Sequence, residues 1–181
     1  MTPPVIVDLE ASGFGGGSYP IEVGTIAADG RGWCSLIRPE PDWRHWDHGA
    51  EAIHHIDRDT LARHGKPCTV VADQLNHLLR GQTVYSDGWA QDYVWLARLF
   101  DAALRRQMFR LEDLRYVLTP EQEIRWHTVK RSVEAELASP RHRASTDAKV
   151  LQLTWLRTRQ EMISPPNPSI IKDLTVKGPA P

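Results

Sequence analysis

The first apolar run of the chain, residues 5–13, carries two carboxylates where a buried strand would normally have none. The run opens with β-branched residues and therefore predicts a buried strand. Asp8 and Glu10 are two residues apart, so an extended chain points both side chains to the same face of a sheet. Because an isolated carboxylate is costly to bury, this pair favours a site for a hard divalent cation. The alternative at this point is a strand that ends at Leu9, with Glu10 in solvent.

A third carboxylate lies in the middle of the chain. Thr83 to Ser86 predicts a short strand, and the residues from about Trp89 to Gln107 predict the helix that follows it. Asp92 lies in the first turn of this helix, near its inward apolar stripe. Asp87 could serve as an N-cap and is the competing candidate, but the helical phase of Asp92 faces the sheet. The stripe consists of Leu96, Leu99, Phe100, Ala103 and Leu104.

A fourth carboxylate begins the last predicted helix. Ser145 or Thr146 can cap this helix, which continues to about Met162, and Asp147 lies at the inward edge of its apolar stripe. His142 lies five residues earlier, in the entry loop, and its pKa near neutrality suits it to accept a proton from water. Four carboxylates brought together repel one another unless cations lie among them. Two Mg²⁺ or Mn²⁺ ions would neutralise them, and such a pair promotes phosphoryl transfer.

The remaining segments predict an α/β chain with one principal domain. Ile21 to Ala28 and Gly32 to Ile37 read as strands on either side of a tight Asp29-Gly30 turn, which makes the first three strands an antiparallel meander. Residues 164–181 contain five of the thirteen prolines and predict an extended or disordered tail after a domain over 1–163. Further predicted elements are an irregular region over 38–66, a helix over 69–79, a strand over 109–114 and a helix over 120–138.

Composition restricts the classes of partner. The formal net charge is −1 and the pI is near 6.7, whereas a chain that grips long nucleic acid by charge alone is usually basic. Phosphates would therefore be handled locally, which favours short or single-stranded substrates. Cys34 and Cys68 are both expected to be reduced core residues, and no secretory signal or membrane-length apolar stretch is evident. These features predict a cytoplasmic protein.

Five of the eight histidines fall within residues 38–66. The spacing His45-x-x-His48 could begin a zinc site, although no cysteine or second well-spaced pair completes a tetrahedral set. We instead expect a loop-and-helix region beside a cleft, packed down by Trp43 and Trp46. The rival hypothesis is a zinc-dependent hydrolase built on His45, His48, His54 and His55.

The acidic segments and one histidine form an ordered set of motifs: Asp8-x-Glu10-Ala11-Ser12-Gly13, then Asp92, then His142-x-x-x-x-Asp147. This set resembles the DEDD superfamily of 3′-to-5′ exonucleases in its DEDDh branch, which includes the proofreading subunit of bacterial DNA polymerase III, ribonuclease T and oligoribonuclease. The resemblance covers about residues 5–160. It is weaker in the middle motif, where members often carry His-Asn and Phe before the aspartate and this chain has Asp87-Gly88 and Gln91.

The resemblance implies a fold, a metal site and a general base. The implied fold is ribonuclease H-like, with a central five-stranded mixed sheet flanked by helices. His142 would be the general base. The implied ligands of two Mg²⁺ or Mn²⁺ ions are Asp8, Glu10, Asp92 and Asp147.

The resemblance also implies residues that contact the substrate. Ala11, Ser12 and Phe14 follow the first acidic pair and would lie beside the 3′-terminal nucleotide. Phe14 could equally be a loop aromatic that packs on the domain. The segment Ile53-His54-His55-Ile56 resembles a His-Gly-Ile motif near the cleft, with His55 in place of glycine, and so adds His54 to the set.

Together these features predict a metal-dependent 3′-5′ exonuclease that converts single-stranded RNA or DNA to nucleoside 5′-monophosphates. The alternative is a catalytically silent module of the same fold that binds nucleic acid or a protein partner; the intact set of five residues argues against it. The choice between RNA and DNA depends on contacts to the 2′-hydroxyl and stays open. Related enzymes are often dimers, so a homodimer also stays open, although the sequence shows no self-complementary face.

Overall fold

The computed structural model describes residues 2–137 and 142–163, with side chains as far as residue 159. The predicted tail over 164–181, and the predicted end of one helix at Ala138, lie outside the described residues. Within the described ranges, no helix is both long enough and apolar enough to cross a membrane.

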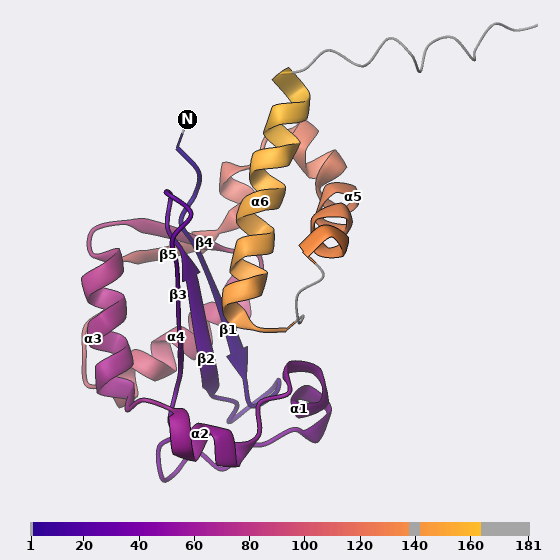
Figure 1. The fold of residues 1–181 in the computed structure, drawn as a ribbon. Coiled ribbons are helices and arrows are strands. Elements are labelled where there is room, and N and C mark those ends of the chain that lie inside the picture. Colours follow the sequence, from indigo (N-terminus) through magenta and orange to yellow (C-terminus); the bar gives the residue numbers. More distant parts are fainter. Residues whose placement is uncertain (1, 138–141, 164–181) are drawn as a thin grey trace, which may run out of the picture.

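A mixed sheet of five strands forms the centre of the molecule (Figure 1). The strands are β1 (Ile6–Ala11), β2 (Pro20–Ile26), β3 (Gly32–Leu36), β4 (Thr83–Ser86) and β5 (Arg110–Asp113). Their order is β3-β2-β1-β4-β5, with antiparallel pairing from β3 to β1 and parallel pairing from β1 to β5. The predicted antiparallel meander and its tight turn are confirmed: the N–H of Ala27 donates to the carbonyl of Arg31 at 2.8 Å, and Gly30 has φ +84°.

Helices cover both faces of the sheet. They are α1 (His48–His54), α2 (Arg58–His64), α3 (Cys68–Leu79), α4 (Trp89–Ala102), the short 3₁₀ helix η1 (Leu114–Val117), α5 (Pro120–Leu137) and α6 (Ala144–Ile163). In Figure 1, α6 packs on one side of the sheet with α5 beyond it, and α3 lies on the other side. The short α1 and α2 lie near the end of β1, in the region that the sequence predicts to be irregular with short helices.

The two faces of β1 contact different cores, as the alternation of side chains along a strand requires. Val7 and Leu9 belong to the larger core with α3 and α4, whereas Ile6 packs with Leu151 and Trp155 of α6. Asp8 and Glu10 have the same parity as Ile6 and therefore face the α6 side. Because β1 continues to Ala11, Glu10 lies within the strand, and the alternative ending at Leu9 is wrong.

The end of α4 differs from the prediction. The helix stops at Ala102 rather than near Gln107, and Leu104, expected in the inward stripe, is 87% exposed. Leu104 has φ +51°; its N–H donates to the carbonyl of Asp101 and the next N–H, that of Arg105, donates to the carbonyl of Phe100. This is the Schellman pattern, which usually places glycine at the left-handed position. The absence of glycine concealed the helix end in the sequence.

One of the two cysteines also departs from expectation. Cys68 is buried at the start of α3 as predicted, and burial raises the pKa of its thiol to about 12. Cys34 is exposed, because it lies on the edge strand β3, so its assignment to the core was wrong. Both thiols are free. Trp43 is buried and stacks on Tyr19 with ring centroids 5.0 Å apart, which confirms its packing role.

Candidate active site

Strand β1 and helix α4 bring three of the predicted carboxylates together. Asp92 lies in the first turn of α4 and is 3% exposed. It accepts a hydrogen bond from the hydroxyl of Ser86 at the end of β4. Burial is the main cause of the raised pKa of Asp8 and of Glu10, and the charge of Asp92 adds to it in both. Since β1 and β4 are parallel neighbours with Ile6 beside Tyr85, the end of β4 at Ser86 lies level with the middle of β1, next to Asp8.

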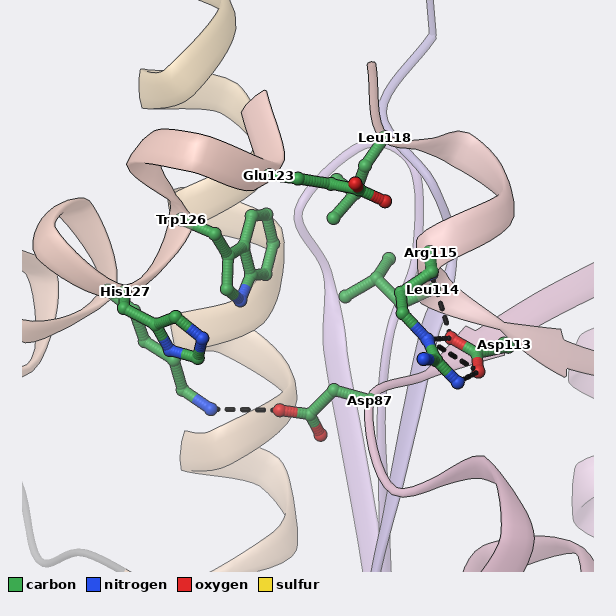
Figure 2. Close-up of a pocket in the computed structure, with 9 residues that line it drawn as sticks. Asp87, Asp113, Leu114, Arg115, Leu118, Glu123, Trp126 and His127 are labelled. Carbon is green, nitrogen blue, oxygen red and sulfur yellow. Dashed lines mark hydrogen bonds and ion pairs between the residues drawn. The ribbon is translucent and has the colours of Figure 1, made fainter. Parts of the chain in front are cut away.

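Asp87, the competing candidate, is exposed and forms an ion pair with a helix outside the cluster, although its charge adds to the effect of burial in raising the pKa of Asp8 and Asp92. The carboxylate of Asp87 lies 2.8 Å from Nζ of Lys130 on α5. Asp87 lines a cavity of about 630 Å³ between the β5–η1 turn and α5, together with residues such as Trp126 and His127 (Figure 2). Asp92 is therefore the buried member of the two candidates, whereas Asp87 is exposed and paired with Lys130.

The start of α6 supplies the remaining two predicted groups. The ligand atoms of Glu10, His142 and Asp147 all lie within 4.8 Å of one another. In the described part of the chain this is the one group of three or more His, Cys, Asp or Glu side chains that meets this distance. Asp8 and Asp92 adjoin the group without belonging to it at that distance.

The capping of α6 differs from the prediction. The helix begins at Ala144, ahead of both Ser145 and Thr146, so neither is the N-cap. The carboxylate of Glu22, on β2, instead accepts the N–H of Ala144 at 3.0 Å. A side chain from a strand far away in the sequence thus satisfies a free N–H at the helix start.

The carboxylates hold their protons unusually strongly. Burial raises the pKa of Asp8 well above its ordinary value, and the charges of Asp92, Glu10 and Asp147 add to this effect. Burial and then the charge of Asp147 raise the pKa of Glu10 to about 8, although the guanidinium of Arg143 acts in the opposite direction. Burial raises the pKa of Asp92 to about 7, against the opposing effect of its hydrogen bond from Ser86.

Hard divalent cations fit this set of donors. All four carboxylates offer oxygen ligands, which Mg²⁺ and Mn²⁺ prefer. Mutual repulsion raises the pKa of Asp8 and Glu10, and bound cations would remove that repulsion. The predicted zinc alternative finds no such support: His45 bonds to Ser12 at 2.9 Å and His48 to Glu51 at 3.1 Å, and neither belongs to the metal-competent group of the described residues.

A cavity of about 390 Å³ opens beside the cluster. Ala11, Phe14 and His54, three of the four predicted substrate residues, line it. Ser12 does not: it is 1% exposed, and its hydroxyl accepts the N–H of Tyr19. The cavity also contains residues that the sequence did not single out. The full lining is Glu10, Ala11, Gly13, Phe14, Asp47, Gly49, Ala50, Ile53, His54, Trp95 and His142.

Trp95 is the most prominent of the residues that were missed. Its ring centroid lies 5.8 Å from that of Phe14, and its indole N–H donates to the hydroxyl of Ser18 at 3.0 Å. Trp95 follows Asp92 by three residues, so the two share one face of α4. That helical spacing was the available sequence signal.

The imidazole of His54, which lines this cavity, has one buried nitrogen without a hydrogen-bond partner in the described structure. The residue is 2% exposed, and its Nδ1 accepts the N–H of Ile56 at 3.0 Å. The neutral ring therefore carries its proton on Nε2, which has no partner in the described structure. Burial lowers the pKa of His54 and favours this neutral form. The next residue, His55, has φ +57° at the end of α1, where the resembling motif has glycine.

No family model matches the sequence, and no curated protein matches it. Solved structures do match in fold. Escherichia coli exonuclease I in complex with a 5cy-dA13 oligonucleotide has a TM-score of 0.61 at 13% identity, over 89% of this chain and 41% of that protein. The zinc-bound form of the E. coli exonuclease I–ssDNA complex has a TM-score of 0.62 at 14% identity, over the same fractions. Exonuclease I from Methylocaldum szegediense has a TM-score of 0.59 at 14% identity, again over 89% and 41%.

These comparisons establish the architecture. This chain spans less than half the length of the exonuclease I chains that it matches. It shares their α/β fold, so the expected ribonuclease H-like arrangement of a five-stranded mixed sheet flanked by helices is confirmed.

Proposed function

We propose that this chain is a metal-dependent 3′-5′ exonuclease of the DEDDh branch, acting on single-stranded RNA or DNA. The observation that carries the proposal is the convergence of Glu10, His142 and Asp147 within 4.8 Å at the mouth of one cavity, with Asp8 and Asp92 beside them. The solved neighbours that bind single-stranded oligonucleotides support the class of substrate.

Asp8, Glu10, Asp92 and Asp147 would hold two Mg²⁺ or Mn²⁺ ions. When bound, such ions lower the pKa of water and stabilise the charge that develops on the attacking and leaving oxygens. Without them, the raised pKa values of Glu10 and Asp92 keep a fraction of these carboxyl groups protonated near neutral pH.

His142 would accept a proton on its imidazole as a water oxygen attacks the terminal phosphorus. The bond from that phosphorus to the 3′-oxygen of the preceding nucleotide then breaks. The terminal residue leaves as a nucleoside 5′-monophosphate. The position of His142 beside Glu10 and Asp147, and on the wall of the cavity, supports this role.

The cavity would receive the 3′-terminal nucleoside. Its volume of about 390 Å³ falls within the usual range for small-molecule sites. Phe14 and Trp95 offer aromatic surface for a base. Phe14 is 72% exposed, which leaves its face available for stacking.

The test is the degradation of matched single-stranded RNA and DNA oligomers labelled at either end. We expect 3′-labelled strands to release labelled mononucleotide at once and 5′-labelled strands to shorten stepwise, with Mg²⁺ or Mn²⁺ and not with a chelator. Asp8→Ala should abolish this cleavage, whereas Asp101→Ala, on the exposed side of α4, should retain it.

Two outcomes would contradict the proposal. If no oligomer is cleaved but Mn²⁺ with nucleoside monophosphate raises the melting temperature, the chain is a silent binding module. If the protein, purified without a histidine tag, contains stoichiometric zinc by mass spectrometry, the zinc hydrolase hypothesis gains support instead.

A further inference from the structure

A buried carboxylate outside the acidic cluster has no place in the chemistry described above. Glu22 lies in β2, a strand whose residues are all buried, and is itself 1% exposed. A carboxylate at such a position is costly unless charge and hydrogen bonds compensate it. A carboxylate in an apolar strand is the same anomaly in the sequence that Asp8 presents.

Two consecutive residues at the start of α6 supply the hydrogen bonds that compensate the buried carboxylate of Glu22. The guanidinium of Arg143 donates to both carboxylate oxygens, with Nε at 3.0 and 3.1 Å and a terminal nitrogen at 2.6 Å. The N–H of Ala144 adds a bond of 3.0 Å. A bidentate guanidinium pair fixes orientation as well as distance, so β2 determines how the chain enters α6.

A second contact on the same face of β2 holds the first turn of α6. Gly24 lies two residues after Glu22, and a Cβ atom at this position would collide with the backbone of Ala144 and Ser145. The helix start therefore lies directly on the backbone of β2. Glu22 and Gly24 hold it at two adjacent points.

The groups held in this way flank the candidate active site. His142 precedes Arg143, and Asp147 follows Ala144 by three residues. His142 has φ +61°, a region that non-glycine residues occupy only when their surroundings hold them there. Glu22 also lies directly opposite Glu10 in the register of β1 and β2. The Glu22–Arg143 pair thus connects β2, the neighbour of the strand that carries Glu10, to the segment that carries His142 and Asp147.

We propose that Glu22 and Arg143 are positioning residues, which set His142 and Asp147 at the correct distance from Glu10 for cation binding and hydrolysis. This proposal rests on the proposed function. Neither residue of the pair is among those that line the nucleoside cavity. It acts by fixing the one segment that brings two of the site groups to β1.

Two conservative variants test the proposal. Arg143→Lys keeps the positive charge but loses the two-point contact, and Glu22→Gln keeps an acceptor for Ala144 but loses the negative charge. The control is Arg157→Lys, which alters another bidentate pair of α6, with Glu136 of α5 at 2.6 and 2.7 Å, outside the acidic cluster. Each folded variant is measured by calorimetric Mn²⁺ titration, by kcat and KM on a labelled oligomer, and by melting temperature.

We expect Arg143→Lys and Glu22→Gln each to weaken Mn²⁺ binding and lower kcat by about 10- to 100-fold, as loss of a supporting contact does at metal sites. KM should change less than kcat, because most of the residues that line the nucleoside cavity lie outside the segment that the pair holds. The double variant should lose no more than the worse single variant, since both changes break one interaction. Arg157→Lys should leave Mn²⁺ affinity and kcat unchanged.

Folded variants with wild-type Mn²⁺ affinity and kcat would overturn the proposal, even if their melting temperatures fall. Failure of both variants to fold would also overturn it, because the pair would then belong to the fold alone. If the wild-type protein cleaves no oligomer but its Mn²⁺ affinity depends on the pair, the positioning role stands and the nuclease function fails.

Discussion

At the level of single residues, aspartates with the same side chain differ in burial and in partners because they lie at different positions relative to the sheet. Asp87 and Asp92 are five residues apart on one loop and helix, yet Asp87 pairs with Lys130 while Asp92 is buried beside Asp8. The same distinction separates Asp101, which is exposed, from Asp92. Chemical type alone therefore does not identify a ligand; its burial and its charged neighbours do.

The substitutions Asp92→Asn and Asp87→Asn form a matched pair that tests this distinction. We expect Asp92→Asn to lower the rate of oligomer hydrolysis by at least about 100-fold, because a lost ligand removes several kcal/mol of charge stabilisation. Asp87→Asn should change the rate little, since it removes only a partly exposed ion pair. Initial rates with Mn²⁺ in excess measure both. The reverse ranking would assign the middle carboxylate to Asp87.

His142→Ala tests the role of the imidazole. Loss of general-base assistance should lower kcat by about 10²- to 10⁴-fold, while Mn²⁺ affinity stays close to the wild-type value. Calorimetric titration is decisive here because His142 lies within 4.8 Å of Glu10 and Asp147. A large loss of Mn²⁺ affinity would make His142 a ligand instead of a base.

At the level of elements, some helix ends have backbone conformations that the sequence does not indicate. Leu104 takes the left-handed position after α4, and His55 takes it after α1. Both positions usually contain glycine, whose absence removes the usual stop signal. The start of α6 is likewise not evident from the local sequence. The side chain that accepts the N–H of Ala144 belongs to Glu22 on β2, and not to Ser145 or Thr146.

Leu104→Gly should therefore stabilise the protein. The left-handed conformation costs a leucine about 1–2 kcal/mol, and the greater flexibility of glycine in the unfolded chain offsets about 0.4–1 kcal/mol of that gain. A net increase of about 0.5–1 kcal/mol in the free energy of unfolding is expected, because Leu104 is 87% exposed and loses little packing. Urea denaturation measures it, with Leu104→Ala as the control that keeps the backbone strain. An unchanged or lower free energy for the glycine variant would show that the strain is absent.

At the level of the whole molecule, the fold holds a cluster of like charges that opposes folding when no cation is bound. The pKa of Glu10 rises from 4.5 to about 8 and that of Asp92 from 3.8 to about 7. The folded state therefore binds protons more strongly than the unfolded chain, and the associated stability is complete only below the unfolded pKa values. It is lost as pH rises through the folded values.

The melting temperature of the metal-free protein should accordingly fall between pH 6.5 and 9. Protonation of His54 does not contribute in this interval, because its lowered pKa reduces stability only at pH values below the ordinary pKa of histidine. Mg²⁺ at pH 8 should restore the loss by binding the folded state. The melting temperature of the Glu10→Gln variant should fall less steeply with pH and should rise less when Mg²⁺ is added. A wild-type melting temperature that is independent of pH and of Mg²⁺ would refute the clustering of charge.

The sequence by itself determined the strand carrying Asp8 and Glu10, the order of the strands along the chain, the meander and the approximate extent of most helices. Each of these depends on local periodicity or on turn chemistry, which neighbouring residues contain. The acidic motifs and their order could likewise be identified without coordinates.

Only the tertiary structure decided which of these groups meet. It separated Asp92 from Asp87, buried Ser12 away from the cavity, brought Trp95 to its wall and left Cys34 and Leu104 in solvent. It also joined Glu22 to Arg143, which are 121 residues apart in the chain. The physical reason is that these outcomes depend on contacts between distant segments, and such contacts leave no trace in local spacing.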